Sequence, residues 1–226
     1  KISSLKSEQI AALSGSTTDT ETLFVVKNLF EKLRIYNIDC RNNLSRGNFE
    51  SRKDWLFNAG IGGIDKADKL LLIGCDPKRE TPVLNSRIRQ KWLTSDLEIK
   101  GLCVPEDLNY HIDNLGDDIS SVANEIFIEK TKNFFSSAKY PMIIFGDNIL
   151  VSKQGRRIHQ AIKRLAYNCH VVNKVWNGLC YLSPNASRVG GLEVDFIPKN
   201  EEFAAFNLEK RIKEKKVKLL ILIEND

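Results

Sequence analysis

Three short runs of apolar residues constrain the fold more than any other feature of this sequence. They span Leu70 to Ile73, Met142 to Phe145 and Leu219 to Ile223. Continuous apolar runs, rather than alternating ones, are typical of parallel strands that are covered on both faces. Each run is far shorter than the ~20 residues that cross a bilayer, so we expect no direct membrane insertion. Gly74 and Gly146 follow the first two runs, whereas Glu224 follows the third.

Segments with helical spacing alternate with these runs. Thr81 and Pro82 predict the start of a helix, and a capping box at Thr18 and Glu21 predicts another. Alternating strands and helices predict a doubly wound α/β fold with a mostly parallel, Rossmann-like sheet. The expected strands cover 10–13, 35–38, 70–73, 102–104, 142–145 and 216–223, the expected helices cover 18–34, 82–92, 123–135 and 155–167, and 171–207 is expected to be rich in loops.

The sequence shows no low-complexity linker. We therefore expect one compact α/β region over residues 1–226, with a possible subdivision near 94–137. The chain has no initiator Met and closes on a strand with no helix after it. Both observations favour a fragment of a larger chain.

Charge and cysteine content exclude several classes of site. The 34 Lys and Arg against 29 Asp and Glu give a net charge of +5, but the basic residues are scattered, so we expect no nucleic-acid partner. The net charge alone leaves open a further alternative, a nucleotide- or RNA-binding module. No CxxC motif occurs, which argues against a metal site and favours buried, reduced thiols. The five cysteines are Cys40, Cys75, Cys103, Cys169 and Cys180.

A ligand crevice is expected beyond the carboxyl ends of the strands, where parallel α/β sheets bind nucleotides. The sequence lacks a complete G-x-G-x-x-G fingerprint, a P-loop and a G-x-S-x-G elbow, so we assign no catalytic residue. Asp39 stands where a ribose-binding acid would be, although a solvated turn residue explains it better. None of His111, His159 and His170 has a partner at metal-ligand spacing. The crevice residues are Gly15, Gly74, Asp76, Gly146 and Asp147.

Residues 55–89 closely resemble the molybdopterin oxidoreductase superfamily. The stretch contains a strand, a Gly74-Cys75-Asp76-Pro77 turn and a helix that begins Pro82-Val83 and contains Arg87-Ile88-Arg89. Within that superfamily, residues 77–85 are similar to the G-type large iron–sulfur subunit of respiratory complex I, NADH:quinone oxidoreductase. Active molybdenum enzymes commonly carry a His where this chain has Thr81.

The resemblance implies a non-catalytic structural domain of the complex I peripheral arm, whose full subunit takes part in electron transfer from NADH to quinone. It implies [2Fe-2S] and [4Fe-4S] clusters in an N-terminal part absent from this sequence, and no cofactor here. The crevice, with Asn58 added, would be vestigial. Implied partners are other peripheral-arm subunits, on the cytoplasmic face of a bacterial inner membrane or the matrix side of the mitochondrial one. An exposed apolar patch is expected near Trp55, Trp92, Trp176 or 203–206.

The alternative is a fragment of an active molybdopterin-guanine-dinucleotide oxidoreductase, such as a formate dehydrogenase relative. In that case Gly15, Asn58, Gly74 and Asp76 would hold the dinucleotide.

Overall fold

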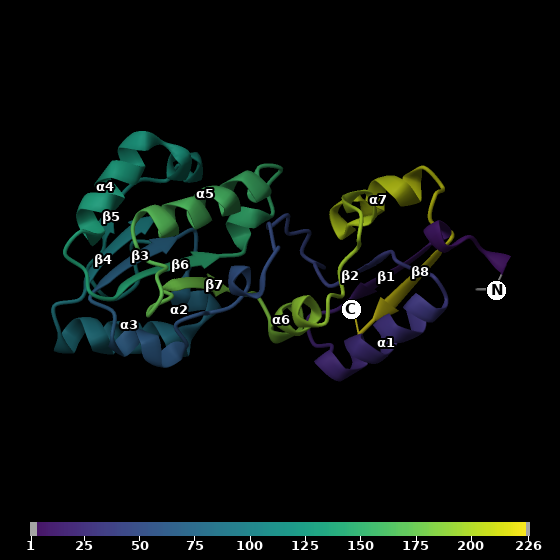
Figure 1. The fold of residues 1–226 in the computed structure, drawn as a ribbon, viewed down its shortest axis with the longest axis horizontal. Helices are drawn as coiled ribbons and strands as arrows, with labels where there is room; N and C mark the ends of the chain where they lie inside the picture. Colours follow the sequence, from purple (N-terminus) through teal and green to yellow (C-terminus); the bar gives the residue numbers. More distant parts are fainter. Residues whose placement is uncertain (1–3, 225–226) are drawn as a thin grey trace. The chain divides into compact units, whose positions relative to one another are not determined.

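The computed structural model describes residues 4–224. Within them the chain divides after Ser45 and after Pro184 into two compact units (Figure 1). Unit 1 combines the two ends of the chain, and unit 2 is the segment Arg46–Pro184. This division differs from the expected single body, and residues 94–137 lie wholly in unit 2. Its boundaries lie in loops without a linker composition, and unit 1 is discontinuous in sequence, so composition alone does not reveal it.

Unit 2 is built on a five-stranded parallel sheet. The strand order is β5-β4-β3-β6-β7, so the chain starts in the middle, builds towards one edge, and then crosses back to build towards the other. Leu71 of β3 pairs with Ile143 of β6 at the centre. The strands are β3 (Lys69–Ile73), β4 (Glu98–Leu102), β5 (Asp113–Asn114), β6 (Pro141–Gly146) and β7 (Leu179–Leu182).

Helices cover both faces of this sheet, as a doubly wound fold requires. One core cluster contains Leu71, Phe134 and Ile162 beneath α4 and α5, and a second contains Leu72 and Ile88 on the α3 face (Figure 1). The helices are α2 (Pro77–Glu80), α3 (Pro82–Thr94), α4 (Glu125–Phe135) and α5 (Gly155–Asn168), with 3-10 turns η3 (Arg52–Asp54), η4 (Ile61–Asp65), η5 (Ile119–Ala123) and η6 (Asn148–Leu150).

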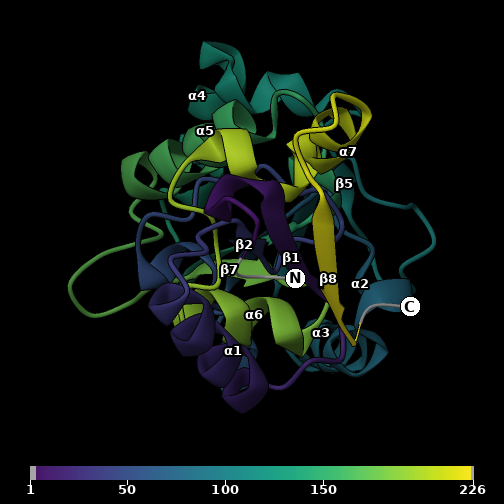
Figure 2. The same cartoon turned by 90° about the vertical axis from the view of Figure 1, so that its right-hand side faces the viewer.

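Unit 1 has a smaller parallel sheet with the order β2-β1-β8. Its central strand β1 pairs with β8 from Ile10 opposite Leu219 to Ser14 opposite Ile223. Helices α1 and α6 lie on one side of these strands and α7 on the other (Figure 2). The elements are η2 (Ser7–Gln9), β1 (Ile10–Ser14), α1 (Thr20–Lys32), β2 (Ile38–Asp39), α6 (Ala186–Glu193), η7 (Glu201–Phe203), α7 (Ala205–Lys213) and β8 (Leu219–Ile223).

The fold class expected from the sequence is confirmed, with two parallel sheets in place of one. Several boundaries differ. Helix α1 is capped by Asp19, whose carboxylate accepts the Thr22 amide at 2.7 Å, rather than by Thr18. The strand expected at 102–104 is β4, which ends at Leu102. The segment 171–207 contains β7 and α6, which the surrounding Asn, Gly and Pro residues concealed. Strand β8 is only partly buried, since it lies at the edge of the three described strands of unit 1.

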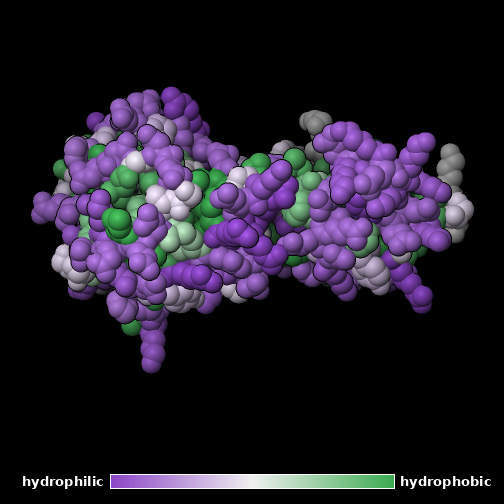
Figure 3. All heavy atoms as spheres, turned by 90° about the horizontal axis from the view of Figure 1, so that it is seen from above, coloured by the Kyte–Doolittle hydropathy of each residue, from purple (hydrophilic) through white to green (hydrophobic). Residues whose placement is uncertain are grey.

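Exposed apolar side chains gather on a different element from the one expected. Trp55, Trp92 and Trp176 are partly buried against the two cores of unit 2. Helix α1 instead exposes Phe24 (54%), Val25 (63%) and Leu29 (52%). Figure 3 shows one face of the molecule. Most side chains on this face are hydrophilic, and apolar side chains lie among them. Among residues 4–224, no helix has the length and apolar character of a membrane span.

Candidate functional site

The carboxyl ends of β3 and β6 form the topological switch point of unit 2. These neighbouring strands pair from Lys69 opposite Pro141 to Ile73 opposite Phe145. After β3 the chain continues to β4 on one side, and after β6 it continues to β7 on the other side. Doubly wound sheets bind ligands at such a point. Gly74, Asp76, Gly146 and Asp147 therefore meet at one edge, as the sequence predicted.

Both glycines allow the chain to approach itself closely. Gly74 has a φ of +54°, and a Cβ on it would overlap the side chain of Ile149 in η6. A Cβ on Gly146 would lie 2.5 Å from the carbonyl oxygen of Gly74 and 3.0 Å from the Cβ of Cys75. The space that glycine leaves for a phosphate in nucleotide-binding sheets is here filled by the protein's own atoms.

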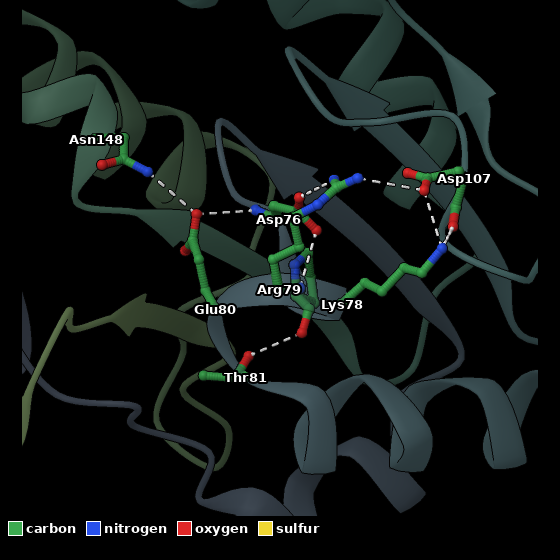
Figure 4. A network of polar contacts seen from close by, with 8 residues as sticks. Asp76, Lys78, Arg79, Glu80, Thr81, Asp107 and Asn148 are labelled. Carbon is green, nitrogen blue, oxygen red and sulfur yellow. Dashed lines mark hydrogen bonds and ion pairs between the residues drawn. The ribbon is translucent and has the colours of Figure 1, made fainter.

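Asp76 is held inside a polar network at the start of α2 (Figure 4). Its carboxylate caps α2 by accepting the Arg79 amide at 3.2 Å, and it accepts the Arg79 guanidinium at 2.6 Å. Arg79 also reaches the carboxylate of Asp107 at 3.5 Å, and the Lys78 ammonium donates to the same carboxylate at 2.9 Å. These bonds depress the pKa of Asp107, the hydrogen bond from Lys78 most strongly. Both oxygens of Asp76 are thus committed to bonds within the protein.

Glu80 joins the two strand ends across the switch point. One of its carboxylate oxygens accepts the backbone amide of Asp76 and the side-chain amide of Asn148, each at 3.1 Å (Figure 4). Burial raises the pKa of Glu80, and the nearby charges of Asp76 and Asp147 act in the same direction. The bridge ties α2 to η6. Sequence reasoning missed the pairing of Glu80 with Asn148, because that pairing depends on the strand order.

Asp147 faces the interior of unit 2. It is 3% exposed, and its carboxylate accepts a hydrogen bond from the hydroxyl of Tyr181 on β7. His159 of α5 is fully buried between the rings of Phe49 and Phe145, with centroids at 5.3 and 5.2 Å.

The protonation of His159 follows from its one hydrogen bond. Its Nδ1 accepts the backbone amide of Asn48 at 2.9 Å, so the neutral ring carries its proton on Nε2, which has no partner among the described residues. Burial lowers the pKa of His159 to about 4, and the charge of Lys163 adds to this effect. The ring is a neutral core group, in agreement with the absence of ligand spacing in the sequence.

Asn58 and Gly15 lie away from this edge, contrary to the expectation that they share one crevice. The Asn58 amide donates to the carbonyls of Lys53 at 2.7 Å and of Leu179 at 2.6 Å. Leu179 begins β7, so Asn58 lies at the amino end of the strands. Gly15 belongs to unit 1, where its amide donates to Ile223 and its carbonyl accepts the Ser187 hydroxyl at 2.9 Å.

In unit 1, helix α6 packs against the carboxyl end of β1. Ser187 of this helix donates to Gly15, and Gly190 packs so closely that a Cβ would overlap the hydroxyl of Thr20. A Cβ on Gly191 would lie 2.5 Å from the Cβ of Cys40. Helix α6 therefore packs against Gly15 at the start of the loop between β1 and α1, whereas Ser16, Thr17 and Asp19 of that loop are exposed. Sequence reasoning missed α6, although Asn185 followed by Ala186-Ser187 is a helix-start signal.

Asp39 is neither a free ribose-binding acid nor a solvated turn residue. It is 2% exposed, and its two oxygens accept the Nε and an Nη of Arg41, both at 2.9 Å. The same carboxylate accepts the backbone amide of Ala205 at 2.8 Å and so caps α7. Burial lowers the pKa of Arg41, but the charge of Asp39, its hydrogen bonds to the guanidinium and other nearby charges together outweigh burial and raise that pKa. This ion pair is part of the core of unit 1.

Four of the five cysteines are buried, as expected, and Cys103 is partly exposed. Burial raises the pKa of Cys40 and Cys180 to about 12 and that of Cys169 to about 11. Residues 4–224 hold no group of three His, Cys, Asp or Glu side chains that is arranged for a metal ion.

A sequence model described as molybdopterin oxidoreductase matches residues 2–226. The chain belongs to this family. Its relatives include a subunit of the NADH-quinone oxidoreductase of Rickettsia felis, 36% identical over 87% of this chain. The mitochondrial NADH-ubiquinone oxidoreductase 78 kDa subunit of Candida albicans is 32% identical over 83%. The mitochondrial NADH dehydrogenase [ubiquinone] iron-sulfur protein 1 of Solanum tuberosum is 30% identical over 88%.

The aligned parts cover 29%, 26% and 27% of these three relatives. This member of the molybdopterin oxidoreductase family thus spans less than a third of their length. The relatives' names agree with the resemblance found at residues 77–85.

Proposed function

We propose that this chain is a non-catalytic structural region of the iron–sulfur subunit of NADH:quinone oxidoreductase, respiratory complex I. The relatives' names favour this role over that of a formate dehydrogenase relative. The observation that carries the proposal is the closed switch point. Ile149 packs on Gly74, and Glu80 joins Asp76 to Asn148 where a family cofactor would approach the strands.

The residues at both strand edges do not fit a pterin dinucleotide. Asp76 is committed to Arg79, and Asp39 is committed to Arg41 and the α7 amide. Asn58 lies at the amino end of the sheet, bonded to the carbonyl of Leu179. Asp39 and Arg41 are buried, so opening that position would leave polar groups without partners, which costs about 1–3 kcal/mol each. No reaction step is therefore assigned to this chain, and electron transfer from NADH to quinone is assigned to clusters elsewhere in the subunit.

The exposed apolar face of α1 supports a packing role. Val25 and Leu29 lie one turn apart on the same face of α1 and are both more than half exposed, an arrangement that suits contact with another protein surface. Other subunits of the peripheral arm, or other parts of the same subunit, are the proposed partners. The proposed location is the cytoplasmic face of a bacterial inner membrane or the matrix side of the mitochondrial one.

Cofactor analysis of the full-length subunit, purified within its complex, tests the proposal. We expect iron and acid-labile sulfide, but neither molybdenum nor guanine dinucleotide in stoichiometric amount. One equivalent of a pterin dinucleotide per subunit would overturn the structural role and restore the molybdoenzyme alternative.

A further inference from the structure

A pocket of about 370 Å³ lies on the α4 face of the unit 2 sheet, away from the switch point. Lys69 of β3 and Lys100 of β4 enter it from the sheet, and Lys130 borders it from α4. Phe134 and Leu71, both in the core, provide apolar lining. We call it the lysine pocket. Its size lies within the range of pockets that bind small ligands.

The lysine pocket has an excess of positive charge. Three ammonium groups border it, and Glu98 is the only carboxylate among its lining residues. Glu98 pairs with Lys69 at 3.0 Å. Lys100 has a weaker partner, since Asp113 lies outside the lining at 3.9 Å and also binds His111 at 3.0 Å. A cleft lined by one sign of charge attracts ligands of the opposite sign.

Two of the ammonium groups lie near the same aromatic ring. The Nζ atoms of Lys69 and Lys100 lie 5.0 and 4.9 Å from the centroid of the same Phe134 ring. Their side chains are only 15% and 28% exposed, so their stems are packed against the protein. Packed stems lose less conformational freedom on binding than free surface lysines do. Two like charges at one ring repel each other, and an anion bound in the pocket would be attracted by both.

We propose that the lysine pocket binds the phosphoryl group of a small phosphorylated molecule. A phosphoryl dianion matches two or three ammonium groups in charge, and its oxygens accept several of their N–H donors. Leu115, a partly buried apolar residue in the lining, would contact the remainder of the molecule. This site is independent of the proposed structural role, because it involves neither the switch point nor the α1 face.

Calorimetric titration of the 226-residue chain with inorganic phosphate and with pyrophosphate tests the proposal. We expect saturable binding that weakens as salt rises. Lys100→Met should weaken it at least about tenfold, in line with the loss of one charge-assisted hydrogen bond. Glu98→Gln should tighten it several-fold, because Lys69 would lose its competing carboxylate.

Lys210→Met on α7 is the matched control, because this side chain is 76% exposed and lies in unit 1. It should leave phosphate binding unchanged. Urea melts check that each variant remains folded, and Glu98→Gln tests the site even if Lys100→Met unfolds. No saturable binding to the wild-type chain, or equal binding by wild type and Glu98→Gln, would overturn the proposal. Succinate binding as tightly as phosphate would overturn the assignment of a phosphoryl group.

Discussion

The carboxylate of Asp54 accepts a hydrogen bond from the ammonium group of Lys163 at 2.9 Å in unit 2. Asp54 is 2% exposed and also accepts the backbone amides of Ser51 at 2.9 Å and Glu50 at 3.1 Å. Burial raises the pKa of Asp54, but Lys163 and the two amides outweigh burial and hold the pKa below its usual value. One carboxylate thus joins η3 to α5.

Removal of the Asp54 carboxylate should lower the stability of the folded chain. We expect Asp54→Ala to lower the free energy of unfolding by about 1–3 kcal/mol, because the Lys163 ammonium and the amides of Glu50 and Ser51 would lose their shared acceptor. Asp65→Ala is the control, since Asp65 forms its pair with Arg87 at the surface and its loss should change stability little. Urea denaturation of both variants provides the comparison. Equal midpoints would show that the buried pair is not stabilising.

His159 should make stability depend on pH. Its pKa is about 4 in the folded chain and near 6.5 when unfolded, so the unfolded chain binds more protons between these values. Stability should therefore be full above pH 6.5 and fall as the pH drops towards 4, by up to about 3 kcal/mol. The charged or titratable groups near the ring are Lys163, Asp54, Asp147 and Tyr181.

His159→Gln should abolish most of this dependence, whereas His111→Gln, at an exposed histidine, should not. Chemical denaturation at several pH values measures the slope. Folding lowers the pKa of Asp54 as well, so the Asp54 contribution is also lost as the pH falls, but only at lower pH, as the solution passes through the depressed pKa of that group. A wild-type slope in His159→Gln would contradict the assignment.

Gly60 and Gly74 of unit 2 both have a positive φ. Comparing their replacement by Ala separates the cost of backbone strain from the cost of side-chain crowding. Gly60 has a φ of +65° and a ψ of 165°, with nothing within 4 Å of an added Cβ, so Gly60→Ala should cost only the strain of this glycine-specific backbone conformation, about 1–3 kcal/mol. Gly74→Ala adds overlap with Ile149 and should cost about 1–3 kcal/mol more. Thermal melts of the pair give the difference. Similar losses would mean that η6 moves aside easily and that the switch point is less tightly closed than its contacts indicate.

Leu71 lies at the centre of the unit 2 sheet and is fully buried. We expect Leu71→Ala to lower the free energy of unfolding by about 2–5 kcal/mol, through lost burial and the cavity left behind. Leu93→Ala on the exposed side of α3 is the matched control, because Leu93 is 58% exposed. A loss below about 0.5 kcal/mol for Leu71→Ala, measured by denaturant melts, would show that β3 is not central to stability.

Asp76→Ala tests whether the switch point takes part in electron transfer. The variant loses the cap of α2, which should cost about 1 kcal/mol of stability. Electron transfer from NADH to quinone in the assembled complex should stay close to wild type, because Asp76 bonds only to protein groups. Activity and complex content are measured together. A large loss of activity at normal complex content would contradict the closed switch point.

The regular core of this fold is readable from sequence because its signals are local. The apolar runs at Leu70 to Ile73 and Met142 to Phe145 identified β3 and β6, and the turns after them correctly placed Gly74 and Asp147 at one edge. The predicted helix at Pro82 also begins where expected.

The side-chain contacts that close the carboxyl edge of the sheet could not be predicted from the sequence in the same way. The bond between Glu80 and Asn148 depends on β3 lying beside β6, and strand order is a property of the whole sheet. Asn58 was misplaced because its loop packs against the start of β7 rather than following a strand end. Asp39 looked solvated because its partners, Arg41 and Ala205, come together only when α7 folds over β2.

The pairing of β1 with β8 joins residues near opposite ends of this sequence, Ile10 with Leu219. During synthesis on the ribosome, β1 emerges long before its partner exists, whereas every strand of the intervening sheet is already complete. Domains generally fold as units as they emerge, so the segment Arg46–Pro184 has the opportunity to fold first. Until β8 arrives, one side of β1 has no strand to pair with, which makes this interval the period when chaperones would matter most for the nascent chain.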